Sequence, residues 1–411
     1  MRIQHLLVDI SPMRESVPYR RLFWGQLISI LGSQLTVVAL PLQVYLLTHS
    51  SLAVGLIGLV QLGPGLVLTL YGGTIADAID RRRILLITQF LQLVLTGTLA
   101  IVAMLPHPPL WLIYVLAALL AGVYGVDAPA RGAMTRNLVR RELFPAAAAL
   151  NALLRQTGAV VGPALAGLII SYFNLSLAYW LDTATYGAAL LAVLLLPPQL
   201  PEGGGTKAGF ASLLEGLHYL RGQPVVQGIL LIDIVAMVFG MPRALFPALG
   251  LTVFGSVRAV GLLYAAPAAG ALIGALSSGW VGHIQQAGRA VLLMVGLWGI
   301  AITMFGICPW LPLALFLLAF AGWADIISEV LRSSMLQLSI PDSLRGRITA
   351  VWLAQTNGSP RLGDVESGVV ASLTNAQFSA ASGGVACVLG VLLLAWLLPA
   401  FRDTELKQVN A

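Results

Sequence analysis

Acidic and basic side chains interrupt several of the most apolar stretches of this sequence. Asp325 and Glu329 are four residues apart and Arg332 follows three residues later, so all three can lie on one face of a helix. Two carboxylates that share a face in a low-dielectric site repel each other, which favours uptake of a proton by one of them. The spacing therefore predicts a proton-binding pair at Asp325 and Glu329.

Two further pairs of opposite charge have helical spacing. Asp127 and Arg131 are four residues apart, and Arg361 and Asp364 are three apart. Each pair can neutralise itself and lock the protein, or its acid can carry a proton, and the sequence leaves both alternatives open. Asp127 and Asp364 are therefore further candidates for proton coupling.

Residues 239–247 place an arginine among two prolines and a glycine. Such residues predict a bent helix whose freed carbonyl groups need water or polar partners. Arg243 can attract an anionic or phenolic ligand at the bend, with Phe239 and Phe246 as apolar walls. The alternative is a salt bridge from Arg243 to Asp233 or to another acid.

Other polar and aromatic side chains in or near the apolar stretches are candidates for substrate contact. Aromatic rings suit a planar substrate, although belts of Trp and Tyr also form at membrane interfaces. A charged group at membrane depth is costly unless it is paired or hydrated, which makes each one a functional candidate. The candidates are Arg131, Arg155, Arg332, Tyr124, Trp323, Trp352 and Gln355.

Twelve apolar stretches supply the helices that must position these residues. A hydrocarbon core about 30 Å thick needs roughly 20 helical residues to cross it. A mean hydropathy of +0.88 with only 10% charged residues excludes an ordinary soluble domain. We predict an all-α membrane protein with twelve transmembrane helices, near residues 20–47, 52–72, 83–104, 110–133, 145–171, 176–197, 224–250, 258–281, 289–308, 311–336, 344–373 and 380–400.

Basic residues predict the orientation of these helices. Arginine or lysine precedes the first stretch and follows every second one, for example at Arg81, Arg136 and Arg289. Cytoplasmic loops retain such residues, so both termini are predicted to be cytoplasmic. The net charge of +6 is thus a signal of topology, and we expect no nucleic-acid partner.

Motifs for catalysis are missing from the sequence. It contains no glycine-rich phosphate loop followed by lysine and serine or threonine, and no serine nucleophile elbow. Cys308 and Cys387 have neither metal-ligand spacing nor a disulfide framework. We therefore expect no enzyme activity, cofactor or metal, and predict transport of a small molecule across the bilayer, driven by protons.

The sequence also repeats itself. Residues 53–56, Ala-Val-Gly-Leu, recur as residues 259–262. A proline- and glycine-rich stretch separates six apolar segments from the other six. We predict two six-helix bundles, 1–196 and 223–411, which rock about a central site and are joined by a cytoplasmic linker, 197–222.

The link between the second and third stretches carries a basic motif. Gly73 is followed by Asp77 four residues later, and then by Arg81 and Arg82. With the twelve-span pattern, this motif resembles the major facilitator superfamily of transporters. The resemblance implies that Gly73, Asp77, Arg81 and Arg82 form a conformational switch, whereas the alternative is a solvated turn. Glycine permits close helix approach, and an aspartate can complement a helix N-terminus.

A narrower resemblance covers most of the chain. Residues 155–167 resemble the glycine–proline signature of the superfamily's exporters. Residues 263–279, 334–337 and 346–355, together with Asp80, resemble the enterobactin-exporter subfamily, which secretes catecholate siderophores from the bacterial cytoplasm.

This resemblance implies a secondary active exporter of a catecholate siderophore or a similar aromatic metabolite. It would act in the bacterial inner membrane by proton antiport and alternating access. One alternative is a multidrug or macrolide-type efflux pump with the same fold. Another is a non-transporting membrane sensor or scaffold, which the switch motif and the charged residues within the spans disfavour.

Overall fold

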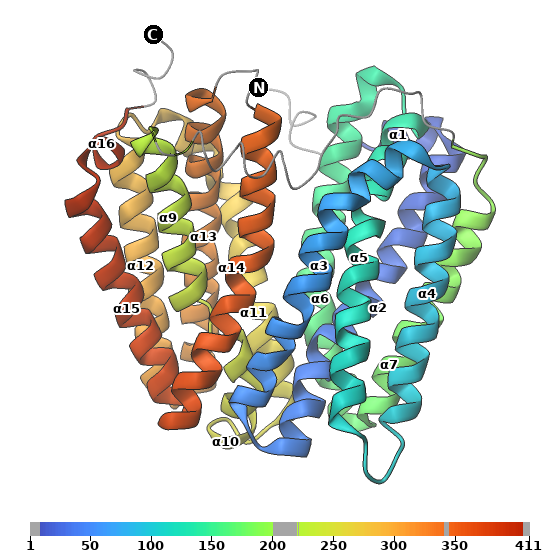
Figure 1. The fold of residues 1–411 in the computed structure, drawn as a ribbon, viewed down its shortest axis with the longest axis horizontal. Coiled ribbons are helices and arrows are strands. Elements are labelled where there is room, and N and C mark those ends of the chain that lie inside the picture. The colour runs from blue at the N-terminus through green and yellow to red at the C-terminus, as the bar shows by residue number, and fades with distance from the viewer. Residues whose placement is uncertain (1–8, 200–219, 221, 341–344, 406–411) are drawn as a thin grey trace. The chain divides into compact units, whose positions relative to one another are not determined.

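The computed structural model describes residues 9–199, 220, 222–340 and 345–405, which are almost entirely helical (Figure 1). Within these ranges no strand occurs, so the predicted all-α class is confirmed. The elements, with η for a 3₁₀ helix, are α1 Ser11–Glu15, α2 Val17–Thr48, α3 Ser51–Ala78, α4 Arg81–Val102, α5 Leu110–Leu138, η2 Arg141–Leu143, α6 Phe144–Tyr172, α7 Leu175–Leu194, α9 Pro224–Phe239, η3 Arg243–Leu245, α10 Phe246–Thr252, α11 Val257–Ser277, η4 Ser278–His283, α12 Ala287–Ile307, α13 Leu311–Ser339, α14 Arg345–Leu373, α15 Ala376–Leu397 and α16 Pro399–Arg402.

In the described part of the chain, eleven helical segments are long and apolar enough to cross a membrane. The eleventh predicted span corresponds to α14, whose 29 residues are also long enough to cross. Its polar and charged side chains, including Arg361 and Asp364, distinguish it from the other long helices. The twelve predicted spans therefore each have a helical counterpart.

The seventh predicted span is interrupted, where the sequence predicted a bent helix. Figure 1 labels its two α-helical pieces as α9 and α10. Gly240 ends α9, and the 3₁₀ turn η3 precedes α10. Pro242 and Pro247 lack the N–H groups that a continuous helix would use here, which explains the break.

The chain divides into two compact units. Unit 1 comprises residues 1–43 and 63–208, and unit 2 comprises residues 44–62 and 209–411. The end of α2 and the first part of α3 thus group with unit 2. Most of the predicted linker, 197–222, lies outside the described residues.

Close helix contacts in unit 2 depend on small residues. A Cβ atom on Gly322 would meet the carbonyl oxygen of Pro267, and one on Gly270 would meet that of Ala319. Backbones that approach this closely are typical of membrane helices, which gain stability from van der Waals packing. The pairing of α11 with α13 therefore requires these glycines.

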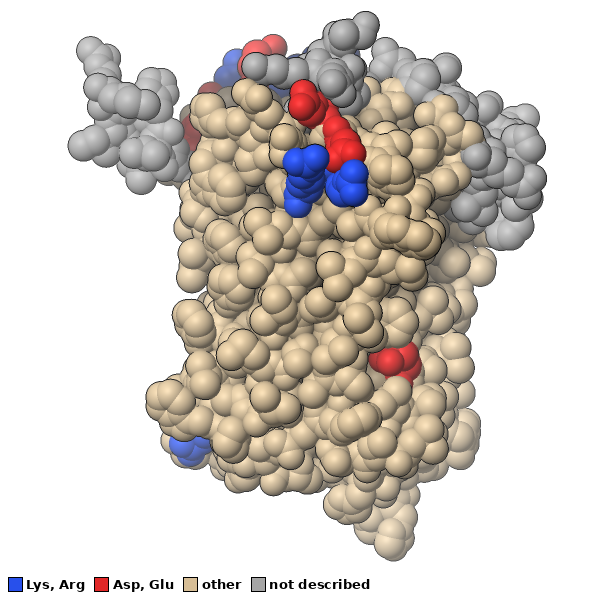
Figure 2. All heavy atoms as spheres, turned by 90° about the vertical axis from the view of Figure 1, so that its left-hand side faces the viewer, with Lys and Arg blue, Asp and Glu red and all other residues tan. Residues whose placement is uncertain are grey.

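Large apolar side chains cover the outside of the helices. Leu276, Leu373 and Trp396 are all strongly exposed. Figure 2 shows one face on which charged side chains gather mainly at one end, beside a broad surface with few charges. Exposed apolar surface of this extent belongs in lipid, so the chain is a multi-pass membrane protein.

Candidate functional site

Arg332 is the centre of a buried ionic network in unit 2. Only 1% of its side chain is exposed, and its Nη1 group donates to the carboxylate of Asp233 on α9. Its Nη2 group lies 3.3 Å from Oδ1 of Asp325 on its own helix. Gln355 of α14 completes the network through a 2.9 Å bond from Nε2 to Oδ2 of Asp233. One arginine thus ties α9, α13 and α14 together.

Of the predicted pair of acids on α13, Asp325 belongs to this network and Glu329 does not. Asp325 contacts Arg332, as described, while the side chain of Glu329 is exposed. Glu329 still lies near enough to repel Asp325 electrostatically. Asp325 therefore interacts with both a cation and an acid, and does not form an isolated pair with Glu329.

The break between α9 and α10 frees carbonyl groups that find polar partners. The indole Nε1 of Trp298 donates to the carbonyl of Gly240 at 2.9 Å. The hydroxyl of Tyr264 donates to the carbonyl of Arg243 at 3.1 Å. These bonds hold the break in one conformation and direct the chain at Arg243.

The side chain of Arg243 is exposed at this break. Asp233, its predicted partner in the alternative interpretation, pairs instead with Arg332. Arg243 attracts Asp364 and Asp325 electrostatically. Arg243 is thus an exposed cation beside the break that attracts two acids.

Asp364 of α14 has an incomplete set of hydrogen bonds. The backbone N–H of Ala244 donates to its carboxylate. Its Oδ1 atom is buried and has no hydrogen-bond partner among the described residues. Arg361, which the sequence paired with it, donates from Nη1 to the carbonyl of Gln61 at 2.5 Å. A buried carboxylate oxygen without a donor is costly unless it binds a proton or a ligand.

Glycines bring α3 and α14 into backbone contact around Asp364. A Cβ atom on Gly55 would meet the carbonyl of Asp364, and one on Gly58 would lie 2.9 Å from that of Arg361. On α14, a Cβ atom on Gly368 would lie 2.8 Å from the carbonyl of Ser51. This tight crossing explains why Oδ1 of Asp364 is shielded from solvent.

The predicted aromatic residues of unit 2 have different environments. Phe246 is only 2% exposed, and its ring packs edge-on against Tyr264 and Phe305. Trp323 stacks on Phe320 with ring centroids 5.6 Å apart. Phe246 therefore supports the break from within the core, whereas Phe239, Trp323 and Trp352 are half-buried.

In unit 1 the predicted pair on α5 is well satisfied. Arg131 donates to Oδ2 of Asp127 from Nε at 2.9 Å and from Nη2 at 2.6 Å. Thr88 and Gln89 of α4 donate to Oδ1 at 2.7 and 3.4 Å. Asp127 is 2% exposed and has a donor at both oxygens. This geometry fits a structural lock better than a proton carrier.

Asp182 of α7 is a further buried acid in unit 1. The hydroxyls of Thr36 and Thr185 both donate to its carboxylate. The sequence made Asp182 a functional candidate as an ionisable residue in an apolar span, but assigned it no partner, because Thr36 is 146 residues away in the chain. The signal in the sequence is that Asp182 is a single acid within an apolar span, where a charged group is costly.

The switch motif is partly described. Asp77 lies in α3, but its side chain is outside the described residues. Asp80 caps α4 by accepting a 2.9 Å bond from the N–H of Arg82, and accepts another from the N–H of Gln199. The N–H of Arg81 donates to the carbonyl of Gln199 at 3.1 Å. A Cβ atom on Gly73 would meet nothing within 4 Å among the described residues.

Two other predicted residues lie apart from these networks. Tyr124 is 61% exposed and Arg155 is also exposed. Among the described residues, no group of three His, Cys, Asp or Glu side chains is placed to hold a metal ion.

The chain is similar in sequence to one protein family and to individual exporters. The profile of a family described as transmembrane secretion effectors matches residues 8–411. Two relatives are the enterobactin exporter EntS of Escherichia coli O1:K1 and that of Shigella boydii serotype 18. Each is 33% identical over 414 residues, with 100% of this chain and 99% of the relative covered.

Solved structures of transporters have the same fold. The nucleoside transporter NupG superposes with a TM-score of 0.73 at 14% identity, covering 94% of this chain and 99% of its own. A POT family transporter in complex with 5-aminolevulinic acid gives 0.74 at 13% identity, covering 94% and 97%. The human organic anion transporter MFSD10 gives 0.61 at 17% identity, covering 92% and 98%. At these identities the likeness concerns the fold alone.

Proposed function

This chain belongs to the major facilitator superfamily, in its family of transmembrane secretion effectors, and we propose that it exports a catecholate siderophore or a similar aromatic metabolite. The full-length similarity to enterobactin exporters carries this proposal. The chain would act in the bacterial inner membrane, with both termini in the cytoplasm, because basic residues gather at the ends of every second span.

Arg243 and Asp364 suit a catechol group. The two adjacent oxygens of a catechol can both accept and donate hydrogen bonds. The exposed guanidinium of Arg243 would donate to one oxygen, and the carboxylate of Asp364 would accept from the hydroxyl beside it. The broken backbone holds both groups near each other, since Ala244 follows Arg243 and bonds to Asp364.

The same carboxylate would couple export to protons. Oδ1 of Asp364 is buried in this conformation, so a catechol hydroxyl would reach it only after the crossing of α3 and α14 opens. The atom would then take either a proton or the hydroxyl as its donor, but not both. Proton and substrate would therefore exclude each other, which is the requirement for antiport. Asp325 and Asp127 are weaker candidates, because arginines contact both of them.

Transport into everted vesicles tests this proposal. With an acidic lumen, vesicles that contain the protein should accumulate a catecholate siderophore, and the Arg243→Ala variant should bind it roughly tenfold to hundredfold more weakly. Arg141→Ala, which removes an exposed arginine of η2, serves as the control. Accumulation of a macrolide but not of the siderophore would favour the efflux pump. Accumulation that ignores the pH gradient would exclude proton coupling.

A further inference from the structure

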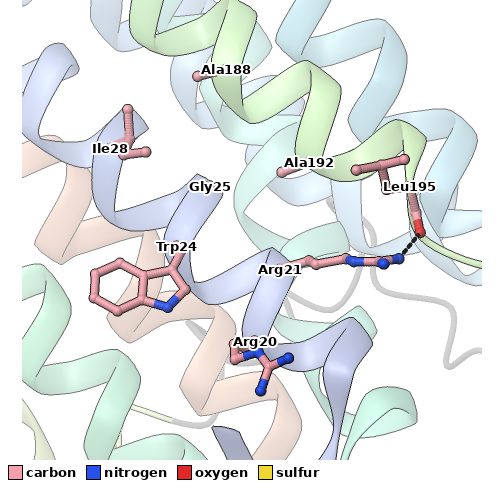
Figure 3. Close-up of a pocket in the computed structure, with 8 residues that line it drawn as sticks. All are labelled: Arg20, Arg21, Trp24, Gly25, Ile28, Ala188, Ala192 and Leu195. Carbon is pink, nitrogen blue, oxygen red and sulfur yellow. Dashed lines mark hydrogen bonds between the residues drawn. The ribbon is translucent and has the colours of Figure 1, made fainter.

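A groove between α2 and α7 in unit 1 is separate from the ionic networks described above. Its volume is about 280 Å³, and Figure 3 shows its residues. Two arginines, Arg20 and Arg21, lie where α2 begins, and Leu195 lies just beyond the end of α7. The groove therefore combines a cationic end with an apolar length.

The apolar part of the groove follows the contact line of the two helices. A Cβ atom on Gly25 would lie 2.7 Å from the Cβ atom of Ala192, so small residues form its floor. Trp24, 51% exposed, and Ile28 line it as well. The distance from Arg21 to Ile28 is about 10 Å along the helix axis. This length fits a phosphate, a glycerol group and the first carbons of an acyl chain.

The cationic end is held in place by the last carbonyl groups of α7. Arg21 donates from Nη1 to the carbonyl of Leu195 at 3.0 Å, as Figure 3 shows. Arg82 donates to the carbonyls of Val193 and Leu194 at 3.4 and 2.8 Å. A guanidinium has five N–H donors, so one such bond leaves Arg21 able to bind a phosphate.

Two electrostatic effects oppose each other at this end of α7. The C-terminus of a helix carries about half a negative charge, which disfavours an anion. Arg20, Arg21 and Arg82 contribute three positive charges beside it. The cations outweigh the helix dipole, so the site favours an anionic group.

We propose that this groove binds one phospholipid with an anionic headgroup, with its phosphate on Arg20 and Arg21 and an acyl chain along the floor of Gly25 and Ala192. The charge of the arginines and the exposed indole of Trp24, a side chain typical of membrane interfaces, support a lipid as the occupant. The groove lies in a multi-pass membrane protein, so lipid surrounds it at high concentration.

Native mass spectrometry of the purified, delipidated protein tests this proposal. Titration with phosphatidylglycerol and, separately, with phosphatidylcholine of the same chains should show one tightly retained phosphatidylglycerol. The double variant Arg20→Gln/Arg21→Gln should bind it roughly thirtyfold more weakly, because each of the two arginines near a membrane surface contributes about fivefold in affinity. Arg141→Gln, the same change at an exposed site outside the groove, should bind within about twofold of the original protein.

A second variant tests the apolar part without changing charge. Ala188→Leu fills the groove and should also weaken retention of phosphatidylglycerol while leaving both arginines in place. Equal retention of the two lipids, or undiminished binding by either groove variant, would overturn the proposal. Inorganic phosphate that competes as well as the lipid would show a soluble-anion site, which would overturn it too.

Discussion

The two units bury acidic residues in different ways. In unit 1, Asp127 pairs with Arg131 one turn along the same helix, and donors from one neighbouring helix complete the site. In unit 2, Arg332 holds Asp233 of another helix and Asp325 of its own. The first ion pair lies within one helix, whereas the ion pair of Arg332 with Asp233 joins two helices. A change at the unit 2 network should therefore affect packing as well as charge.

Removal of Arg332 should produce the largest effect. In Arg332→Leu, Asp233 is left as a buried acid without its cation, which destabilises a protein by about 3–5 kcal/mol. We expect poor recovery of the purified variant in detergent and a clearly lower midpoint of thermal unfolding.

The matched change in unit 1 is Arg131→Leu. Asp127 keeps its bonds from Thr88 and Gln89, so the expected loss is smaller, at about 1–3 kcal/mol. Equal losses in the two variants would show that the comparison between the units is wrong.

Asp364→Asn should separate coupling from binding. The asparagine keeps the shape of the side chain but cannot take up a proton, so transport into everted vesicles should lose its response to the pH gradient. Exchange of substrate across the membrane without a gradient should continue, because it needs no net movement of protons.

The acids that arginines contact should behave differently from Asp364 when they are neutralised. Asp127→Asn in unit 1 and Asp325→Asn in unit 2 should keep most of the gradient response, since arginines already contact both acids. Loss of the response in Asp325→Asn, with a normal response in Asp364→Asn, would place the proton site on α13 as the sequence first predicted.

The sequence was sufficient for those parts of the structure that depend on local spacing. Apolar length predicted the helices, and the four-residue spacing of Asp127 and Arg131 predicted a contact that the structure contains. Proline and glycine near Arg243 predicted a disturbed helix. Each of these features is decided within a few turns of one helix.

Contacts between residues that are far apart in the chain could not be predicted from local spacing. Arg332 and Asp233 are 99 residues apart, and only the packing of α9 on α13 brings them together. The same packing leaves Glu329 exposed, although its spacing from Asp325 matched that of a pair. Helical spacing shows which residues can share a face, but not which neighbouring helix that face meets.

The two units differ in how an arginine holds the end of their last described helix, α7 in unit 1 and α16 in unit 2. In unit 1, Arg82 donates to the free carbonyls of Val193 and Leu194. In unit 2, Arg289 pairs at 2.9 Å with Asp403, which follows α16. The first anchor is made to backbone carbonyls, which do not titrate, whereas the second is an exposed ion pair.

The unit 2 anchor should respond to salt and, only in strong acid, to pH. Hydrogen bonds from Arg402 and then from Arg289 lower the pKa of Asp403 to about 2, from a usual value near 3.9. Its stabilising effect is therefore complete above about pH 4 and is lost as the pH falls through about 2. Between about pH 5 and 8 it should be constant.

The rate of amide hydrogen exchange in α16 reports how strongly the ion pair of Arg289 with Asp403 holds this helix. We expect the effect here to be smaller than those of the preceding variants. Asp403→Asn should speed exchange over residues 399–405 by at most about fivefold at about pH 7, because an exposed ion pair contributes little. The difference from the original protein should shrink in about 1 M salt, where charges are screened within about 3 Å.

Arg82→Gln, the control in unit 1, should speed exchange at the end of α7 with much less dependence on salt. A difference for Asp403→Asn that changes between about pH 5 and 8 would contradict the assignment and indicate that another titrating group holds α16.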